Sequence, residues 1–222
     1  DGVAISSLLH YPTAPYFIKN FKNIGNTHYL QKLKKEKKKI NIIKDLKKFQ
    51  NALAFSQGVT RRGSYAAYLD ISHPEIEEFL DIRKPTGGDI NRKSTNLHHA
   101  VVIPNSFMEL IDRATQEDGF DDSWELIDPH SGKVTKTVSA KTLWVKLIQN
   151  RVETGEPYIM FEDTVNEALP DFQKDLGLRV NHSNLCSEIT LPTNEDRTAV
   201  CCLSSVNLEN FDEWQDNEYF IP

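Results

Sequence analysis

A thiol, a carboxylate and an amide lie close together late in this 222-residue sequence, at Cys186, Glu188 and Asn184. Their positions alternate with a period of two, so on an extended segment the three side chains point the same way. A thiol readily donates a hydrogen atom or one electron, and a carboxylate two residues away can take a proton from a substrate hydroxyl. The pattern favours redox or radical chemistry, with Asn184 hydrogen-bonded to the same substrate oxygen.

A structural interpretation of these residues competes with the chemical one. Free cysteine is often a small buried hydrophobic residue, and the triplet alone leaves the two interpretations evenly balanced. Cys201 and Cys202 could be a metal half-site, a redox thiol or core. A zinc site needs about four N or S ligands, usually from CxxC-type pairs, which adjacent thiols do not supply. His98 and His99 fall on a predicted strand and point to opposite faces, so we expect no metal.

Composition and cysteine use indicate a cytoplasmic protein. Hydrophobic residues make up 39% of the chain and charged residues 26%, which is ordinary for a soluble protein. No apolar run approaches the length of a transmembrane helix, and no signal-peptide pattern is present. Three cysteines, two of them adjacent, do not make a secreted disulfide framework, so a reducing compartment is predicted and no membrane is involved.

Charge is distributed unevenly along the chain. Residues 11–48 hold eleven lysines against Glu36 and Asp45, whereas the remainder carries twice as many acidic as basic residues. A segment so unlike the rest is treated separately. It could bind nucleic acid or phosphate. We favour the alternative, a solvated surface helix or an insertion.

Beyond residue 48 the pattern predicts an α/β architecture with substantial parallel pairing. Strands are expected over 65–71, 98–103 and 157–161, and a short one near 2–6. Helices are expected from Pro74 to about Lys84, over 106–115, and from Ser139 to Gly155. A hairpin is expected at 124–135, and a polar loop before the thiol motif.

A basic loop precedes the first of these strands. It spans residues 56–64 and carries two adjacent guanidiniums, Arg61 and Arg62. Such a loop could grip phosphate or stack on a base, and the competing interpretation is a solvent-exposed turn. A lone basic loop is weak evidence and gains weight only beside the thiol motif.

Several motifs together resemble the large catalytic subunit of ribonucleotide reductase. They agree in order and spacing over about residues 49–214, and more weakly over 2–7. The residues that carry the resemblance are Asn184–Ile189, Leu191–Thr193, Cys201–Leu208, Ser56–Ser64, Tyr65–Ile71, His73 and Pro74, Glu77–Leu80, Glu153–Gly155 and Pro157–Ile159.

The resemblance implies an α/β fold that is part of a ten-stranded barrel, with the radical cysteine on a central finger loop. Residues 1–10 would be a barrel-strand remnant, 11–48 a lysine-rich unmatched insertion or disrupted segment, and 49–222 the first half of the barrel with its finger loop.

Residue roles follow from the same resemblance. Cys186 would be the thiyl-radical cysteine that removes the ribose 3′ hydrogen, Glu188 the base on the 3′ hydroxyl, and Asn184 a hydrogen-bond partner of the substrate hydroxyls. Cys201 would be half of the reducing cysteine pair. The specificity loop between effector and substrate would contain Ser56, Gln57, Gly58, Arg61, Arg62 and Gly63.

The resemblance also implies partners. These are a radical-generating small subunit that carries a diiron or other dimetal cofactor, a ribonucleotide substrate, dNTP and ATP effectors, thioredoxin or glutaredoxin as reductant, and a second copy of the full-length subunit in a homodimer. This chain itself would bind no cofactor. The other redox cysteine and the second half of the barrel would lie outside the 222 residues, so we expect the isolated chain to be inactive. A cobalamin-dependent reductase of the same barrel family and a non-catalytic nucleotide-binding fragment remain alternatives.

Overall fold

The computed structural model describes residues 3–7, 64–194, 196–200, 205 and 207–216. Its centre is a four-stranded sheet in the order β1 (Val3–Ser7), β2 (Tyr65–Asp70), β3 (His98–Ile103) and β6 (Tyr158–Phe161). β2, β3 and β6 are parallel, and β1 pairs antiparallel with β2. The predicted parallel α/β arrangement is therefore confirmed.

β2 and β3 are buried on both faces and β6 is partly buried, which is why these strands are near-continuous apolar runs in the sequence. Alternate residues of each strand point to opposite faces. Tyr65, Leu69 and Val101 face one hydrophobic cluster, whereas Ala66, Tyr68 and Ala100 face the other.

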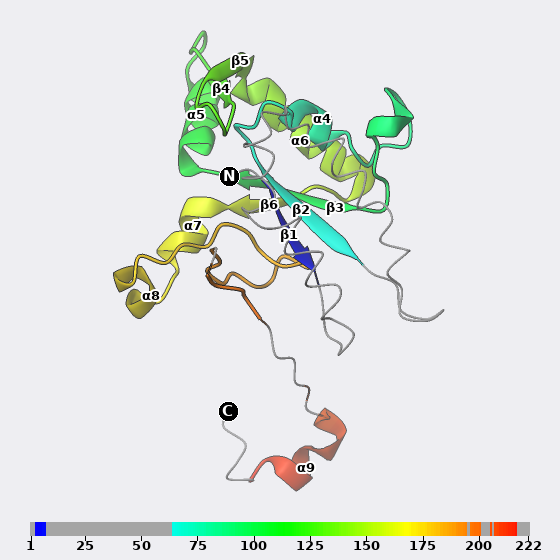
Figure 1. Cartoon of the computed structure of the whole chain (residues 1–222), viewed down its shortest axis with the longest axis vertical. Coiled ribbons are helices and arrows are strands. Elements are labelled where there is room, and N and C mark those ends of the chain that lie inside the picture. The colour runs from blue at the N-terminus through cyan, green and yellow to red at the C-terminus, as the bar shows by residue number, and fades with distance from the viewer. Residues whose placement is uncertain (1–2, 8–63, 195, 201–204, 206, 217–222) are drawn as a thin grey trace.

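Three helices close the first face of the sheet (Figure 1). They are α4 (Ile76–Leu80), α5 (Asn105–Gln116) and α6 (Ala140–Thr154), which bury Phe79, Phe107 and Leu147 among others. A parallel pair of strands needs a crossover connection, and helices in such connections pack on a face of the sheet. A 3₁₀ turn (η2, Ile90–Arg92) lies between α4 and β3.

The residues at the two ends of α6 act as the sequence predicts. Ser139 Oγ accepts a hydrogen bond from the backbone N–H of Thr142 at 3.1 Å, which satisfies one free donor of the first turn. Gly155 ends the helix at φ 78°, a left-handed conformation that glycine adopts without a Cβ clash. The predicted hairpin is also present as β4 (Ser123–Ile127) and β5 (Val134–Ser139).

Two predictions about local structure are wrong. The helix after Pro74 is a five-residue segment that ends at Leu80, so the basic residues Arg83 and Lys84 lie beyond it. The expected polar loop before the thiol motif contains two short helices, α7 (Glu162–Glu167) and α8 (Asp171–Asp175). Val165 of α7 and Leu169, which follows that helix, pack into the second hydrophobic cluster, and this tertiary contact supports a helix whose polar composition conceals it. Near the C-terminus lie η3 (Leu208–Asn210) and α9 (Phe211–Trp214).

Phe107→Ala is expected to lower the free energy of unfolding by about 3–5 kcal/mol, because a fully buried ring leaves a cavity. Trp124 contacts this ring edge-on, with centroids 4.9 Å apart, so its fluorescence in a urea titration reports the loss. Phe172→Ala is the matched control, because that ring is 64% exposed. A Phe107→Ala variant as stable as the control would contradict this account of the core.

Candidate active site

The Cys186 motif forms a tight turn. The backbone N–H of Ser187 donates to the carbonyl of Asn184 at 3.2 Å, and Ser187 has φ 65°. A non-glycine residue in the left-handed region is uncommon and marks a constrained turn. The extended geometry assumed for the motif is therefore wrong, because the alternation of a strand does not set its side-chain directions.

The side chain of Asn184 closes this turn. Its Oδ1 accepts hydrogen bonds from the backbone N–H groups of Glu188, at 3.1 Å, and Ile189, at 3.2 Å. Ser183 Oγ donates to the carbonyl of Ile189 at 2.6 Å and ties the two ends of the segment together. Asn184 thus shapes the loop that carries the thiol, in the way that Asn side chains stabilise turns generally.

The thiol and the carboxylate are both accessible. Cys186 is an exposed free cysteine and Glu188 is also exposed, so the interpretation of Cys186 as a buried core residue is wrong. Burial raises the pKa of the Tyr158 hydroxyl, and the charges of Glu156, Cys186 and Glu188 raise it further.

The turn is attached to the sheet through its first two residues. Tyr68 Oη donates to the carbonyl of Asn184 at 2.7 Å, across 116 residues of sequence. Leu185 packs into the second hydrophobic cluster, which includes Tyr68, Ala100 and Met160. Burial is the main cause that raises the pKa of Tyr68, so the phenol stays a neutral donor.

A buried cluster of charged and polar groups that the sequence did not predict lies at the start of β3 and β6. Glu156 accepts from the backbone N–H of His99 at 3.0 Å, lies 3.0 Å from His99 Nδ1, and forms an ion pair with Arg83 at 3.1 Å. It also contacts His98 Nδ1. One carboxylate thus binds both histidines.

The two histidines do point to opposite faces, as predicted. His99 is fully buried against Phe79, whereas the half-buried His98 ring stacks on Tyr158 with centroids 6.3 Å apart. A Glu between Gly155 and Pro157 carries no sequence signal for this contact. Only the pairing of β3 with β6 brings it beside residues almost 60 positions earlier.

Opposing effects set the ionisation of this cluster. Burial raises the pKa of Glu156, but hydrogen bonds from His99 and the charges of His99 and Arg83 outweigh it and lower the pKa to about 2. Burial lowers the pKa of His99 as well. We therefore assign the positive charge that pairs with Glu156 to Arg83. A neutral His99 can still donate its hydrogen bond to Glu156.

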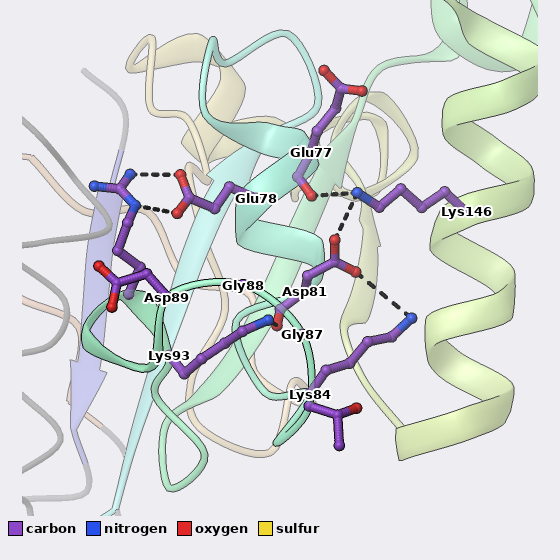
Figure 2. A pocket seen from close by; sticks show the side chains of 11 residues that line it. Glu77, Glu78, Asp81, Lys84, Gly87, Gly88, Asp89, Lys93 and Lys146 are labelled. Atoms are coloured by element: carbon purple, nitrogen blue, oxygen red, sulfur yellow. Dashed lines mark hydrogen bonds and ion pairs between the residues drawn. The ribbon is translucent and has the colours of Figure 1, made fainter.

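A second charged feature is a surface pocket on the side of the sheet that carries α4 and α6. Figure 2 shows Lys146 between Glu77 and Asp81, and Lys84 on the other oxygen of Asp81. Lys146 Nζ lies 2.8 Å from Asp81, and Lys93 Nζ donates to the Asp81 carbonyl at 2.9 Å. These pairs join α4, α6 and the loop after α4, so the pocket belongs to helix packing rather than to the thiol turn.

Several predicted site residues lie outside the described part of the chain. They are Cys201 and its neighbour Cys202, the lysine-rich segment 11–48, and the loop residues Ser56, Gln57, Gly58, Arg61, Arg62 and Gly63. Within the described ranges, no group of three or more His, Cys, Asp or Glu is arranged to hold a metal ion. No helix among those residues is long and apolar enough to cross a membrane.

Glu156→Gln is expected to lower the free energy of unfolding at pH 7 by about 3 kcal/mol, because it breaks a buried ion pair. The folded pKa of about 2 lies below the ordinary 4.5, so the wild-type contribution is present above pH 4.5 and is lost as pH falls towards 2. Urea titrations across this range should show a smaller pH dependence in the variant. Glu153→Gln, an exposed carboxylate nearby on α6, is the control. Equal pH dependence in wild type and Glu156→Gln would contradict the assignment.

The chain matches known proteins over most of its length. A family model described as "Ribonucleotide reductase, barrel domain" matches residues 28–221. The ribonucleoside-diphosphate reductase large subunit of Invertebrate iridescent virus 3 is 45% identical over 233 residues, covering 83% of this chain and 37% of that protein. A putative ribonucleoside-diphosphate reductase large subunit of Frog virus 3 is 53% identical over 165 residues, 74% of this chain and 28% of that protein.

Among solved structures, the class Id ribonucleotide reductase alpha subunit of Actinobacillus ureae is similar, with a TM-score of 0.50 and 37% identity. The match covers 69% of this chain and 24% of that one. This chain spans 37% or less of each of these three relatives. Because the family model matches most of the chain, the chain belongs to the ribonucleotide reductase barrel-domain family.

Proposed function

We propose that this chain is part of a catalytic subunit that reduces ribonucleotides to deoxyribonucleotides by thiyl-radical chemistry. The observation that carries the proposal is the accessible Cys186 thiol on a hydrogen-bonded turn, with the Glu188 carboxylate two residues away. Membership of the barrel-domain family supports the same conclusion.

Each residue of the turn takes one role. The Cys186 thiyl removes the 3′ hydrogen atom of the ribose, which forms the S–H bond and leaves a carbon radical. Glu188 takes the proton of the 3′ hydroxyl, and its exposed carboxylate is accessible to a substrate. Returning the hydrogen atom from Cys186 at the end regenerates the thiyl, so Cys186 is not consumed.

The reduction itself needs two electrons and two protons. A pair of thiols supplies them and becomes a disulfide, while the 2′ hydroxyl leaves as water. Cys201 is proposed as one thiol of this pair. The loop with Ser56, Gln57, Gly58, Arg61, Arg62 and Gly63 is proposed to sense the effector and contact the substrate.

The proposed partners follow from the family. Relatives named large subunits or large chains favour the type that works with a small subunit, which would supply the radical from a diiron or other dimetal cofactor. The described residues of this chain offer no cluster that fits such a metal centre. Thioredoxin or glutaredoxin would reduce the disulfide, dNTP and ATP would be effectors, and the full-length subunit would be a homodimer. A reducing cytoplasm would keep the thiols free.

A chimera tests the proposed function. Residues 64–216 of this chain replace the matching segment in the large subunit of Invertebrate iridescent virus 3, which is assayed with its small subunit for ribonucleoside diphosphate reduction. The chimera is expected to be active, Cys186→Ala to abolish turnover, and Glu188→Gln to lower kcat about 100-fold, as for loss of a general base.

Glu167→Gln, an exposed carboxylate on α7, is the matched control and should keep the activity of the chimera. A chimera that melts like the viral parent but reduces no substrate would count against the proposal. So would full activity in Cys186→Ala.

The isolated 222-residue chain is expected to show no turnover with a ribonucleotide, a dithiol reductant and a small subunit. The chain spans 37% of its viral relative, so it lacks most of the surface that a complete subunit would offer to substrate and partner. The assay measures deoxyribonucleotide formation by chromatography. Turnover above the Cys186→Ala background would refute this expectation.

A further inference from the structure

Three residues of the parallel sheet form one row beneath the thiol turn. Tyr68 of β2 pairs in register with Ala100 of β3, and Ala100 pairs with Tyr158 of β6. Tyr68 and Ala100 belong to the second hydrophobic cluster and Tyr158 packs against it, so all three face the same side of the sheet. Neighbouring strands lie about 4.8 Å apart, which puts the backbones that carry the two phenols roughly 10 Å from each other.

The middle residue of this row, Ala100, is small, whereas Tyr68 and Tyr158 on either side of it carry large rings. Ala100 is fully buried, and Leu185 packs into the same cluster with only 9% of its surface exposed. Leu185 directly precedes Cys186, and Asn184 accepts the hydrogen bond of Tyr68 Oη at 2.7 Å. The row thus contacts the turn by an apolar anchor and by a hydrogen bond, on the residues just before the thiol.

We propose that the row Tyr68–Ala100–Tyr158 is a seat that positions the Cys186 thiol, and that Tyr68 is the positioning residue. In this proposal Leu185 packs over the small Ala100 side chain and so sets how closely the turn approaches the sheet. The hydrogen bond from Tyr68 to the Asn184 carbonyl sets the rotation of the turn relative to the sheet.

The second phenol, Tyr158, lies at the other end of the row and packs against the same hydrophobic cluster. Tyr158 is half-buried, and the charges of Cys186 and Glu188 both raise its pKa. The His98 ring stacks on it, and Glu156 holds His98 in turn. The buried Glu156 cluster therefore holds the Tyr158 end of the row in place.

Accurate placement matters to the reaction proposed above, on which the catalytic part of this inference rests. Transfer of a hydrogen atom needs the reacting atoms about 3–3.5 Å apart, and a 1 Å misplacement can lower a rate about 100-fold. A turn held only by its own hydrogen bonds would not have a fixed position relative to the sheet.

The test compares Tyr68→Phe with Tyr65→Phe in the full 222-residue chain. Both changes remove one hydroxyl from a buried ring of β2, but Tyr65 faces the helix side of the sheet. Hydrogen exchange is measured by NMR at the amides of Ser187, Glu188 and Ile189, which make the hydrogen bonds of the turn. Tyr68→Phe should speed exchange there roughly fivefold, the effect of losing one hydrogen bond, and leave Val101 and Val102 unchanged.

A spectroscopic signature accompanies the exchange. The carbonyl carbon shift of Asn184 should move in Tyr68→Phe and stay in Tyr65→Phe, because only the first loses the donor to that carbonyl. Leu185→Ala, with the exposed Leu176→Ala as control, should also speed exchange at the turn. If the amides of the turn exchange as slowly in both Tyr68→Phe and Leu185→Ala as in the wild type, the proposed seat is wrong.

The chimera adds the catalytic readout. Tyr68→Phe in the chimera should lower kcat about tenfold or more with KM unchanged, whereas Tyr65→Phe should not. If the parent chimera is inactive, the proposed function fails, but the exchange measurements still decide whether the seat exists. An active chimera in which Tyr68→Phe leaves kcat unchanged would remove the catalytic part of the inference.

Discussion

The parallel sheet of β2, β3 and β6 must be covered on both faces, and the rest of the described structure follows from this constraint. Each of its strands is apolar on both sides, so neither face can remain in water. Helices α4, α5 and α6 cover one face. The other is covered by a smaller cluster to which α7, Val180 and the thiol turn contribute. The thiol turn is therefore part of the packing that completes the fold.

This arrangement explains how an exposed thiol is held on an ordered segment. Cys186 is accessible, yet the residue before it is buried and the residue after it is in a left-handed conformation. Leu185 supplies packing, Asn184 supplies turn hydrogen bonds, and Tyr68 joins both to the sheet. Backbone strain is tolerated at Ser187 because these contacts over-determine the turn.

Polar groups stabilise the same sheet at the start of its strands. Glu156 joins β3 to the segment before β6 and compensates Arg83 in a buried place, where an unpaired charge would be costly. On the helix side, Asp81 gathers Lys84 and Lys146 at the pocket of Figure 2 and links α4 to α6. Both networks hold elements that are distant in the sequence, and the Glu156 network ties β3 to the segment that leads into β6.

The sequence by itself determined the elements and the chemistry of the motif. Apolar runs located β2, β3 and β6, Ser139 and Gly155 bounded α6, and the types of Asn184, Cys186 and Glu188 indicated thiol chemistry, because all these signals are local. Only the tertiary structure decided the left-handed turn at Ser187, the helices α7 and α8, the Glu156 cluster and the row Tyr68–Ala100–Tyr158. Each depends on strand register or on contacts across many residues, and periodicity within one segment carries no information about either.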